Sequence, residues 1–442
     1  MPDKTTSEVS AASFRPIHYL GNKSRLLEAI EVVIDEVTAP GAGVCDLFAG
    51  SGVVSRHLSM KRPVFASDIQ EYSRVLTSAL TKPGHFDLEV SRRLISEATS
   101  NLEERLQAIE PLVDFEDKAL RVSVSSPGQL ADIIEHEPMA LASLAINDDL
   151  TRLMLKADHN LGAHARHTML RNYGGVYFSF LQAASLDAIS DSIISLNESQ
   201  RDTAKAALLG VASEIASTVG NHFAQPIRPR DGLGKLKTGW ASTLQKRRTI
   251  NVFDSFANLT EKYSELSPTP CPCETATKDF REALDQLDSS TGVIYADPPY
   301  TRDHYSRFYH VLETIALGDE PGISTSTIAG RQSASRGLYR KERHQSPFSI
   351  KSEVTSAFEY LFKAARRRSI PVVLSYSPST SGTISRPQSR LITIPELADL
   401  ARPYFREVRV ESAGTISHSK FNSQHLNSEI DPFAEVFIIG TY

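Results

Sequence analysis

Cysteine, tryptophan and long apolar runs are scarce in this chain of 442 residues, and each scarcity argues against a class of protein. Three cysteines are too few for a disulfide framework, so we expect a reducing, cytoplasmic compartment. Cys271 and Cys273 lack a second pair that would complete a zinc site, so we expect no metal. No run of about eighteen apolar residues occurs, which argues against a membrane span. Residues 1–14 have no apolar signal core and are predicted to be a flexible tail.

Positive charge is also not in excess, because the net charge is −5, but basic residues are gathered locally. One stretch surrounds the single tryptophan, Trp240, and a second forms a basic loop later in the chain. Basic loops with an interleaved aromatic residue suit phosphates and bases, although an ordinary solvated face is the alternative. The candidate nucleic-acid contacts are Arg228, Arg230, Lys235, Lys237, Lys246, Arg247 and Arg248 in the first stretch, and Arg336, Arg340 and Lys341 in the second.

The first eighty residues show strands that alternate with helices. Apolar residues at helical spacing predict a helix over residues 24–37, and a buried strand is predicted over residues 44–48. A glycine turn follows and leads into a helix from Val53, and residues 63–69 read as a second buried strand that ends near Asp68. This order is typical of a doubly wound α/β sheet.

The character of the sequence changes after residue 81, where most segments read as helices. Strands return at residues 293–295, 371–377 and 435–442, with a helix at residues 353–367 between them. The segment "SPTPCPCETA", residues 267–276, is predicted to be a flexible connection. We therefore predict an α/β domain in two parts, residues 15–81 and 288–442, split by a mainly helical insertion of residues 82–287.

The glycine turn "DLFAGSG" is a candidate nucleotide site. Gly50 and Gly52 lie between a strand and a helix, where the backbone can approach a ligand and helix amides face it. Asp68 ends the next strand, where a carboxylate can accept both hydroxyls of a ribose. The third glycine of a dinucleotide motif is missing, which favours a single adenosyl group over a pyrophosphate cofactor.

Two further motifs flank this turn in the sequence. "HYLGNKSRLL" places Tyr19 and Lys23 ahead of a helix, where they could hold a carboxylate and an apolar chain; alone it would read as an ordinary helix start. "YADPPY" sets Asp297, Pro298, Pro299 and Tyr300 at the end of a strand. The prolines end the strand because they fix φ and remove two backbone donors.

Taken in order, "YLGNK", "DLFAGSG", "ASDI" and "ADPPY" resemble the Dam-like class of adenine-specific DNA methyltransferases. The resemblance covers residues 14–78 and 292–442, and it implies a Rossmann-like domain that uses S-adenosylmethionine and acts on double-stranded DNA. The insertion then lies where this class has its target-recognition region. The implied cofactor contacts are Tyr19, Lys23, Asp46, Phe48, Gly50, Gly52, Asp68 and Asp297.

The resemblance also gives the "DPPY" motif a chemical purpose. An adenine 6-amino group is a poor nucleophile because its lone pair is delocalised into the ring. The carboxylate of Asp297 and the carbonyl of Pro298 can accept hydrogen bonds from it, and Tyr300 can stack on a base flipped out of the duplex. Methyl transfer of this kind requires no metal and no covalent intermediate. Arg302 and Arg307 follow the motif and could contact the flipped nucleotide or nearby phosphates, or form a polar loop.

Other functions stay open at this point. RNA or a protein amide could be the methyl acceptor, because related tetrapeptides act on other planar amines. A DNA-reading subunit of a defence complex is a third hypothesis, which the intact motifs disfavour. DNA adenine methylation in restriction–modification or phage defence, with a cognate nuclease or defence partner, is the function that we predict.

Overall fold

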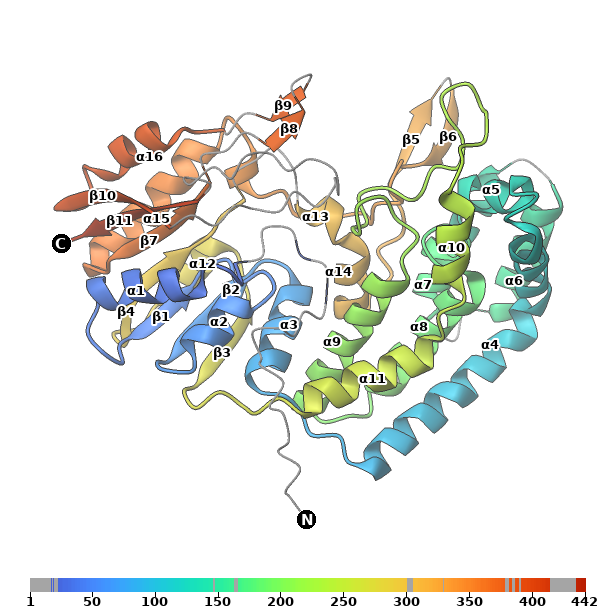
Figure 1. Ribbon diagram of the computed structural model, residues 1–442, viewed down its shortest axis with the longest axis horizontal. Coiled ribbons are helices and arrows are strands. Elements are labelled where there is room, and N and C mark those ends of the chain that lie inside the picture. Colours follow the sequence, from blue (N-terminus) through green and yellow to red (C-terminus); the bar gives the residue numbers. More distant parts are fainter. Residues whose placement is uncertain are drawn as a thin grey trace, which may run out of the picture.

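The central feature of the fold is a mostly parallel seven-stranded sheet with the order β10-β11-β7-β4-β1-β2-β3 (Figure 1). The structure is a computed structural model that describes residues 17, 19, 23–145, 148–162, 166–299, 305–328, 330–377, 381–383, 386–388, 391–413 and 435–442. The strands of this sheet are β1 (Gly43–Asp46), β2 (Val64–Asp68), β3 (Cys273–Thr277), β4 (Thr291–Ala296), β7 (Val372–Tyr376), β10 (Glu407–Ser412) and β11 (Val436–Thr441). Only β11 is reversed, since it pairs antiparallel with both β7 and β10. The predicted α/β class is confirmed.

Helices cover both faces of the sheet, because alternate side chains of each strand point to opposite sides. In β4, Val293 and Tyr295 join a core with α1 (Leu27–Val37) and α2 (Val53–Leu58). Ile294 and Ala296 join a second core on the other face. That face is covered by α12 (Phe280–Asp285), α15 (Val354–Arg368) and α16 (Ile394–Ala401).

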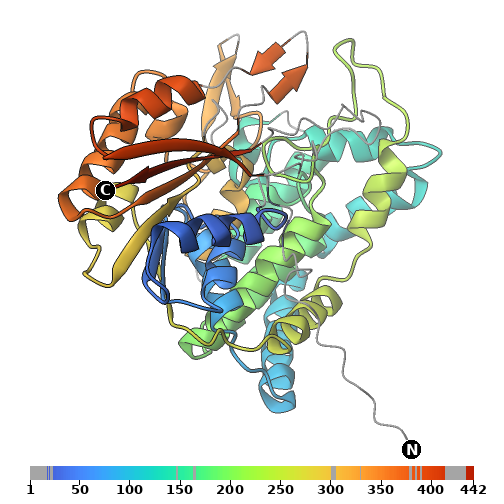
Figure 2. The ribbon, with the colours of Figure 1, turned by 60° about the vertical axis from the view of Figure 1, so that its left-hand side comes forward.

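A third core belongs to a helical region that lies beside the sheet in both views (Figures 1 and 2). It contains α4 (Leu88–Val122), α5 (Gly128–Glu135), η1 (Met139–Leu144), α6 (Asp149–Leu161), α7 (Thr168–Tyr173), α8 (Phe180–Ile193), α9 (Glu198–Ile215), α10 (Trp240–Arg248) and α11 (Val252–Ser264). Helix α3 (Glu71–Thr81), which follows β2, packs against both this region and the sheet. Helix α14 (His310–Leu317), which follows the short α13 (Tyr305–Phe308), packs against α3 and α9. The described residues between β2 and β3 thus form helices and loops.

The chain returns to the sheet earlier than the sequence pattern suggested. The prediction of a flexible connection over residues 267–276 is wrong at its end, because Cys273–Thr277 is strand β3 and pairs in parallel with β2. β3 is an edge strand with several half-exposed side chains, so its sequence lacks the apolar run of a buried strand. The segment predicted as an insertion, residues 82–287, therefore includes β3, which is part of the sheet, and α12, which packs on one face of it.

A strap of chain, residues 338–348, runs from the helical region back to the sheet. Leu338 is buried in the helical core, and Phe348 is buried in the sheet core beside Phe48 and Phe280. Leu338 and Glu342 have positive φ values of 50° and 57°, which are strained for side chains of this kind. The strap follows the β5–β6 hairpin (Thr325–Ile328 and Arg331–Ala334) and leads into η2 (Pro347–Ser349). A second hairpin pairs β8 (Ser381–Thr383) with β9 (Arg386–Gln388).

Candidate functional site

The main pocket opens at the carboxyl ends of β1, β2 and β4. Strand order reverses at this point, because the chain builds β2 and β3 on one side of β1, and β4 and β7 on the other. Open α/β sheets bind ligands at such a switch point. The pocket encloses about 1000 Å³ of empty space, part of it open to solvent. Its walls include Tyr19, Lys23, Phe48, Gly50, Ser51, Asp68, Lys278, Asp279, Phe280, Asp297, Pro299, Tyr305, Ser306, His344, Ser346 and Pro347.

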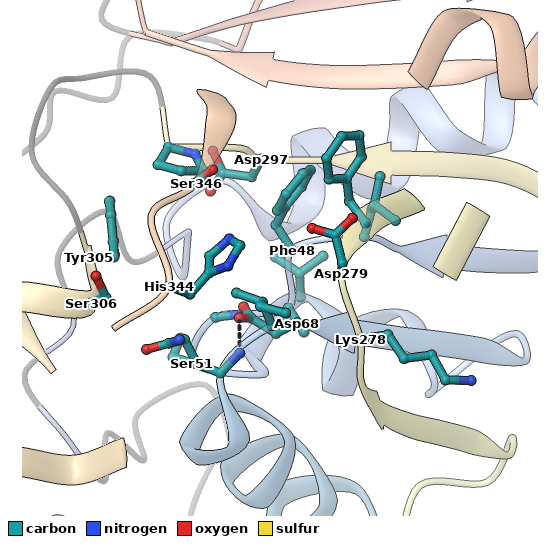
Figure 3. Close-up of a pocket in the computed structure, with 18 of the residues that line it drawn as sticks. Phe48, Ser51, Asp68, Lys278, Asp279, Asp297, Tyr305, Ser306, His344 and Ser346 are labelled. Atoms are coloured by element: carbon teal, nitrogen blue, oxygen red, sulfur yellow. Dashed lines mark hydrogen bonds between the residues drawn. The ribbon is translucent and has the colours of Figure 1, made fainter. Parts of the chain in front are cut away.

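The glycine turn and Asp68 are bonded to each other at the base of the pocket. The backbone N–H of Gly50 donates to Oδ2 of Asp68 at 3.0 Å (Figure 3), and that of Gln70 donates to Oδ1 at 2.9 Å. Burial raises the pKa of Asp68 above its ordinary value, although these two bonds oppose the rise. Gly50 has a φ of +55°, and a Cβ there would lie 2.8 Å from the Tyr19 hydroxyl. The turn therefore requires glycine for its conformation and for the approach of Tyr19.

Asp46 and Gly52, which were predicted to contact a cofactor, lie behind the pocket wall. Asp46 is buried, and its Oδ2 accepts a bond of 2.6 Å from the Ser55 hydroxyl. Burial raises the pKa of Asp46 to about 7. A Cβ on Gly52 would lie 2.8 Å from Cα of Thr77, so this glycine allows α2 to pack closely against α3. Among the described residues, neither belongs to the pocket lining.

Asp297 is held in a buried ionic cluster. The Lys23 ammonium lies 2.9 Å from the Asp297 carboxylate and 3.1 Å from the Glu435 carboxylate. Glu435 also accepts a bond of 2.5 Å from the Ser375 hydroxyl. The side chains of Lys23 and Glu435 are 4% and 1% exposed, whereas that of Asp297 is 20% exposed. Lys23 and Asp297 both line the pocket, and Asp297 is the most exposed member of the cluster.

The remaining members of the "DPPY" motif are only partly described. Pro299 lines the pocket, while Pro298 is buried and is absent from its described lining. Tyr300 and Arg302 lie outside the residues that the structure describes, so their predicted contacts remain predictions.

Aromatic rings form two opposite walls of the pocket. On one side, Tyr19 stacks on Tyr309 with ring centroids 5.0 Å apart and an interplanar angle of 10°, and Tyr305 lies beside both. On the other side, Phe48 packs against Phe280 with ring centroids 6.3 Å apart. Such walls suit a flat, apolar group held between charged ends.

Several lining residues were missed by sequence reasoning. Asp279 and Phe280 follow β3, and the acid just after a strand repeats the signal that identified Asp68. His344 and Ser346 belong to the strap, and Figure 3 shows the His344 ring between Asp297 on one side and Asp68 on the other. Burial lowers the pKa of His344, against the opposing effect of the Asp279 and Asp68 carboxylates. No local pattern marks a strap residue as a pocket residue.

Two of the predicted nucleic-acid contacts are corrected by the structure. Arg248 is buried in the helical core, where it pairs with Glu116 and donates to the carbonyls of Gly175 and Val176. Arg340 is 6% exposed and pairs with Asp319 at 2.5 Å. A guanidinium that is buried and already paired has no face for a phosphate, so neither residue can act as an external DNA contact.

The other basic candidates differ in how far they are free to meet a ligand. Arg230 pairs with Asp132 and Glu135, and Arg247 donates to the Asn221 side chain and the Ala216 carbonyl. The exposed ones are Arg228, Lys235, Lys237, Lys246, Arg336 and Lys341. In the described part of the chain, no cluster of His, Cys, Asp or Glu has the arrangement of a metal site, and no helix could traverse a membrane.

Comparison with known proteins identifies the family to which this chain is similar. The model of a family described as D12 class N6 adenine-specific DNA methyltransferase matches residues 19–161 and 242–373. The chain is 24% identical over 424 residues to the modification methylase LlaI of Lactococcus lactis subsp. lactis, across 96% of this chain and 54% of that protein. It is 25% identical over 374 residues to the type II methyltransferase M.FokI of Planomicrobium okeanokoites, across 82% of this chain and 44% of that protein. The chain thus spans about half the length of these curated relatives.

Proposed function

Because the chain belongs to the D12 class N6 adenine-specific DNA methyltransferase family, we propose that it methylates the 6-amino group of an adenine in duplex DNA. S-adenosylmethionine is the proposed methyl donor, and the adenine is flipped out of the helix to reach the pocket. The observation on which the proposal depends is the position of Asp297. Its carboxylate is fixed by Lys23 and partly exposed in the same pocket that holds Asp68.

We assign the sheet to a Rossmann-like methyltransferase domain. The position of the pocket at the reversal of strand order supports this, because doubly wound sheets bind nucleotides there. The helical region between β2 and β3 is then an insertion that recognises the target sequence. It packs on the sheet through α3, which follows the carboxyl end of β2. Its surface includes exposed basic residues such as Arg228 and Lys235.

The described residues fit the proposed cofactor. Asp68 uses its two oxygens for the N–H groups of Gly50 and Gln70, and a carboxylate has further acceptor positions for ribose hydroxyls. Phe48 and Phe280 offer an aromatic surface for the adenine ring, with Asp279 at its edge. Tyr19 and Lys23 supply an aromatic face and a positive charge for the methionine part. When bound, the cofactor supplies an electrophilic methyl group on its sulfonium.

Asp297 has the catalytic role in this proposal. Its carboxylate accepts a hydrogen bond from the adenine amino group and directs the nitrogen lone pair toward the methyl group. Lys23 and Glu435 hold the carboxylate in position, so little reorganisation is needed when the base arrives. Tyr305 lines the pocket and lies beside the buried Tyr309, so it offers an aromatic surface that can shield a flipped base from water.

The biological setting is inferred from the names of the relatives. One is named a modification methylase and the other a type II methyltransferase, so we propose that this chain also marks DNA in restriction–modification. A cognate nuclease, whose cleavage the mark would prevent, is the proposed partner.

The test is single-molecule sequencing of genomic DNA from cells that express the wild type or the Asp297→Ala variant. We expect methyladenine at one recurring motif with the wild type and none with the variant. Loss of the acceptor should lower the transfer rate by about 100- to 1000-fold, similar to loss of other preorganised groups.

Asp114→Ala serves as the matched control, because Asp114 is an exposed carboxylate on α4, outside the pocket lining. This variant should leave the same marks as the wild type. Wild-type cells without any new DNA mark would contradict DNA as the substrate and would favour RNA or a protein amide. Normal marking by Asp297→Ala would remove Asp297 from the catalytic role.

A further inference from the structure

Two arginines from separate segments lie over the ring of one tyrosine beside the pocket, and two more arginines lie nearby. The Cζ atoms of Arg307 and Arg343 lie 5.1 Å and 4.5 Å from the ring centroid of Tyr339. Arg228 lies close enough to interact electrostatically with both Tyr339 and Arg336. We call Arg228, Arg307, Arg336 and Arg343 the arginine cluster. Arg228 comes from the loop before α10, Arg307 from helix α13, and Arg336 and Arg343 from the strap and the turn just before it.

Tyr339 is a fixed platform for this cluster. Its hydroxyl donates to the Ala224 carbonyl at 2.7 Å and accepts from Nη2 of Arg307 at 3.0 Å. Its ring packs edge-on against the buried His310, with centroids 5.3 Å apart. The Tyr339 side chain is 7% exposed, and its ring and hydroxyl hold the guanidinium groups of Arg307 and Arg343 against it. A held guanidinium loses little entropy when it binds a ligand.

The cluster carries an excess of positive charge in the described part of the protein, because Glu135, which interacts electrostatically with Arg228, is already paired with Arg230. Other arginines nearby have acidic partners, as Arg230 has in Glu135 and Arg340 has in Asp319. None of the ion pairs between described residues includes a member of the arginine cluster. Partial burial and the charge of Arg307 both lower the pKa of Arg343. Like charges held together in this way favour an anion that would bind between them.

The cluster lies directly next to the site of the proposed chemistry. Ser306 and His344 both line the pocket, and their immediate neighbours in the chain are Arg307 and Arg343. Adjacent Cα atoms are about 3.8 Å apart, so the cluster begins one residue outside the pocket wall on two sides. An anion bound there would therefore lie close to any group that enters the pocket.

We propose that the arginine cluster binds the backbone phosphates that flank the flipped adenine. This inference rests on the proposed function and adds a role to it, because the phosphate contacts help to offset the cost of extruding the base. Arg307 and Arg343 then act as positioning residues, since they hold the nucleotide without touching the reacting atoms.

The test compares the wild type with Arg307→Ala/Arg343→Ala on two synthetic duplexes that contain the motif found by genome sequencing. In one duplex the target adenine is paired with thymine, and in the other it faces an abasic site and is already unpaired. Single-turnover methylation rates and the salt dependence of DNA affinity are measured for both. Arg92→Ala/Arg93→Ala is the matched control, because it removes two exposed arginines near the start of α4, far from α13 (Figure 1).

We expect the double variant to methylate the paired duplex about 10- to 100-fold more slowly than the wild type, since base extrusion costs a few kilocalories. The abasic duplex should restore its rate to within about threefold, because the extrusion cost is then small. The slope of log affinity against log salt should become shallower by about two, the value for two lost phosphate contacts. The control should match the wild type on every measurement.

An unchanged salt slope in the double variant would overturn the phosphate site. An equal loss of rate on both duplexes would overturn the link to base extrusion. If the wild type methylated neither duplex, the proposed function would fail, while the salt slope would still decide whether the cluster binds phosphate. Arg307→Lys/Arg343→Lys, which keeps both charges, should retain most of the slope and separates charge from loss of folding.

Discussion

The sheet and the helical region use their charged residues in different ways. In the sheet, Asp68 and Asp297 follow strands whose carboxyl ends meet at one edge, so both side chains reach the same pocket. In the helical region, Lys246 and Arg248 are only two residues apart on α10, yet Lys246 is exposed and Arg248 is buried against Glu116. A strand end fixes where a side chain points, whereas the same charge on a helix can face the core or the solvent. The difference gives three predictions.

The largest expected effect distinguishes the two charges on α10. Arg248→Ala should lower the free energy of unfolding by about 3–5 kcal/mol, because it leaves the buried Glu116 carboxylate without its partner. Lys246→Ala should change stability by no more than about 0.5 kcal/mol, as expected for an exposed surface residue. Denaturant unfolding of the two purified variants measures both values. If the two variants were equally stable, the assignment of Arg248 to the core and of Lys246 to the surface would be wrong.

The next effect tests the strand end of β2. Asp68→Ala should raise the KM for S-adenosylmethionine by about 10- to 100-fold, which corresponds to the loss of charged hydrogen bonds. The value of kcat should change much less, because the proposed role of Asp68 is to bind and not to react. Steady-state kinetics at saturating DNA separates the two constants. Asp68→Asn, which keeps one carbonyl acceptor, should lie between the wild type and Asp68→Ala, and a KM unchanged in both would contradict the assignment.

The smallest effect lies at the boundary between the two regions. Glu313 on α14 accepts bonds of 3.0 Å from the N–H groups of Glu71 and Tyr72 at the start of α3, and burial raises its pKa to about 7. Between about pH 4.5 and 7 the Glu313 carboxyl group is protonated in the folded state but ionised in the unfolded chain. The contribution of this group to stability therefore falls as pH rises through that window. Glu313→Gln should reduce that slope by up to about 1.4 kcal/mol per pH unit.

Urea unfolding across this pH range measures the slope for the wild type and for Glu313→Gln. The exposed Glu261 on α11 provides the control, since Glu261→Gln should leave the slope as it is. A slope that is the same in Glu313→Gln and in the wild type would rule out Glu313 as the titrating group.

Sequence reasoning reached the parts of the site that depend on local patterns. The predicted strands over residues 63–69 and 293–295 correspond to β2 and β4, and the structure places Asp68 and Asp297 in one pocket. β3 was missed because an edge strand needs few apolar residues, and Asp279 was missed with it. Glu435 and Arg248 could not be assigned, because each depends on a partner that is distant in sequence, Lys23 and Glu116. His344 and Ser346 were not predicted as pocket residues for the same reason, since only the fold brings this part of the strap to the pocket.

The ionic cluster of Lys23, Asp297 and Glu435 has a consequence for the order in which the protein is made. Its members come from near residue 20, near residue 300 and just before β11, and they meet only after β11 has inserted between β7 and β10. A chain still growing on the ribosome therefore lacks the complete ionic cluster until Glu435 and β11 have emerged and the sheet has closed.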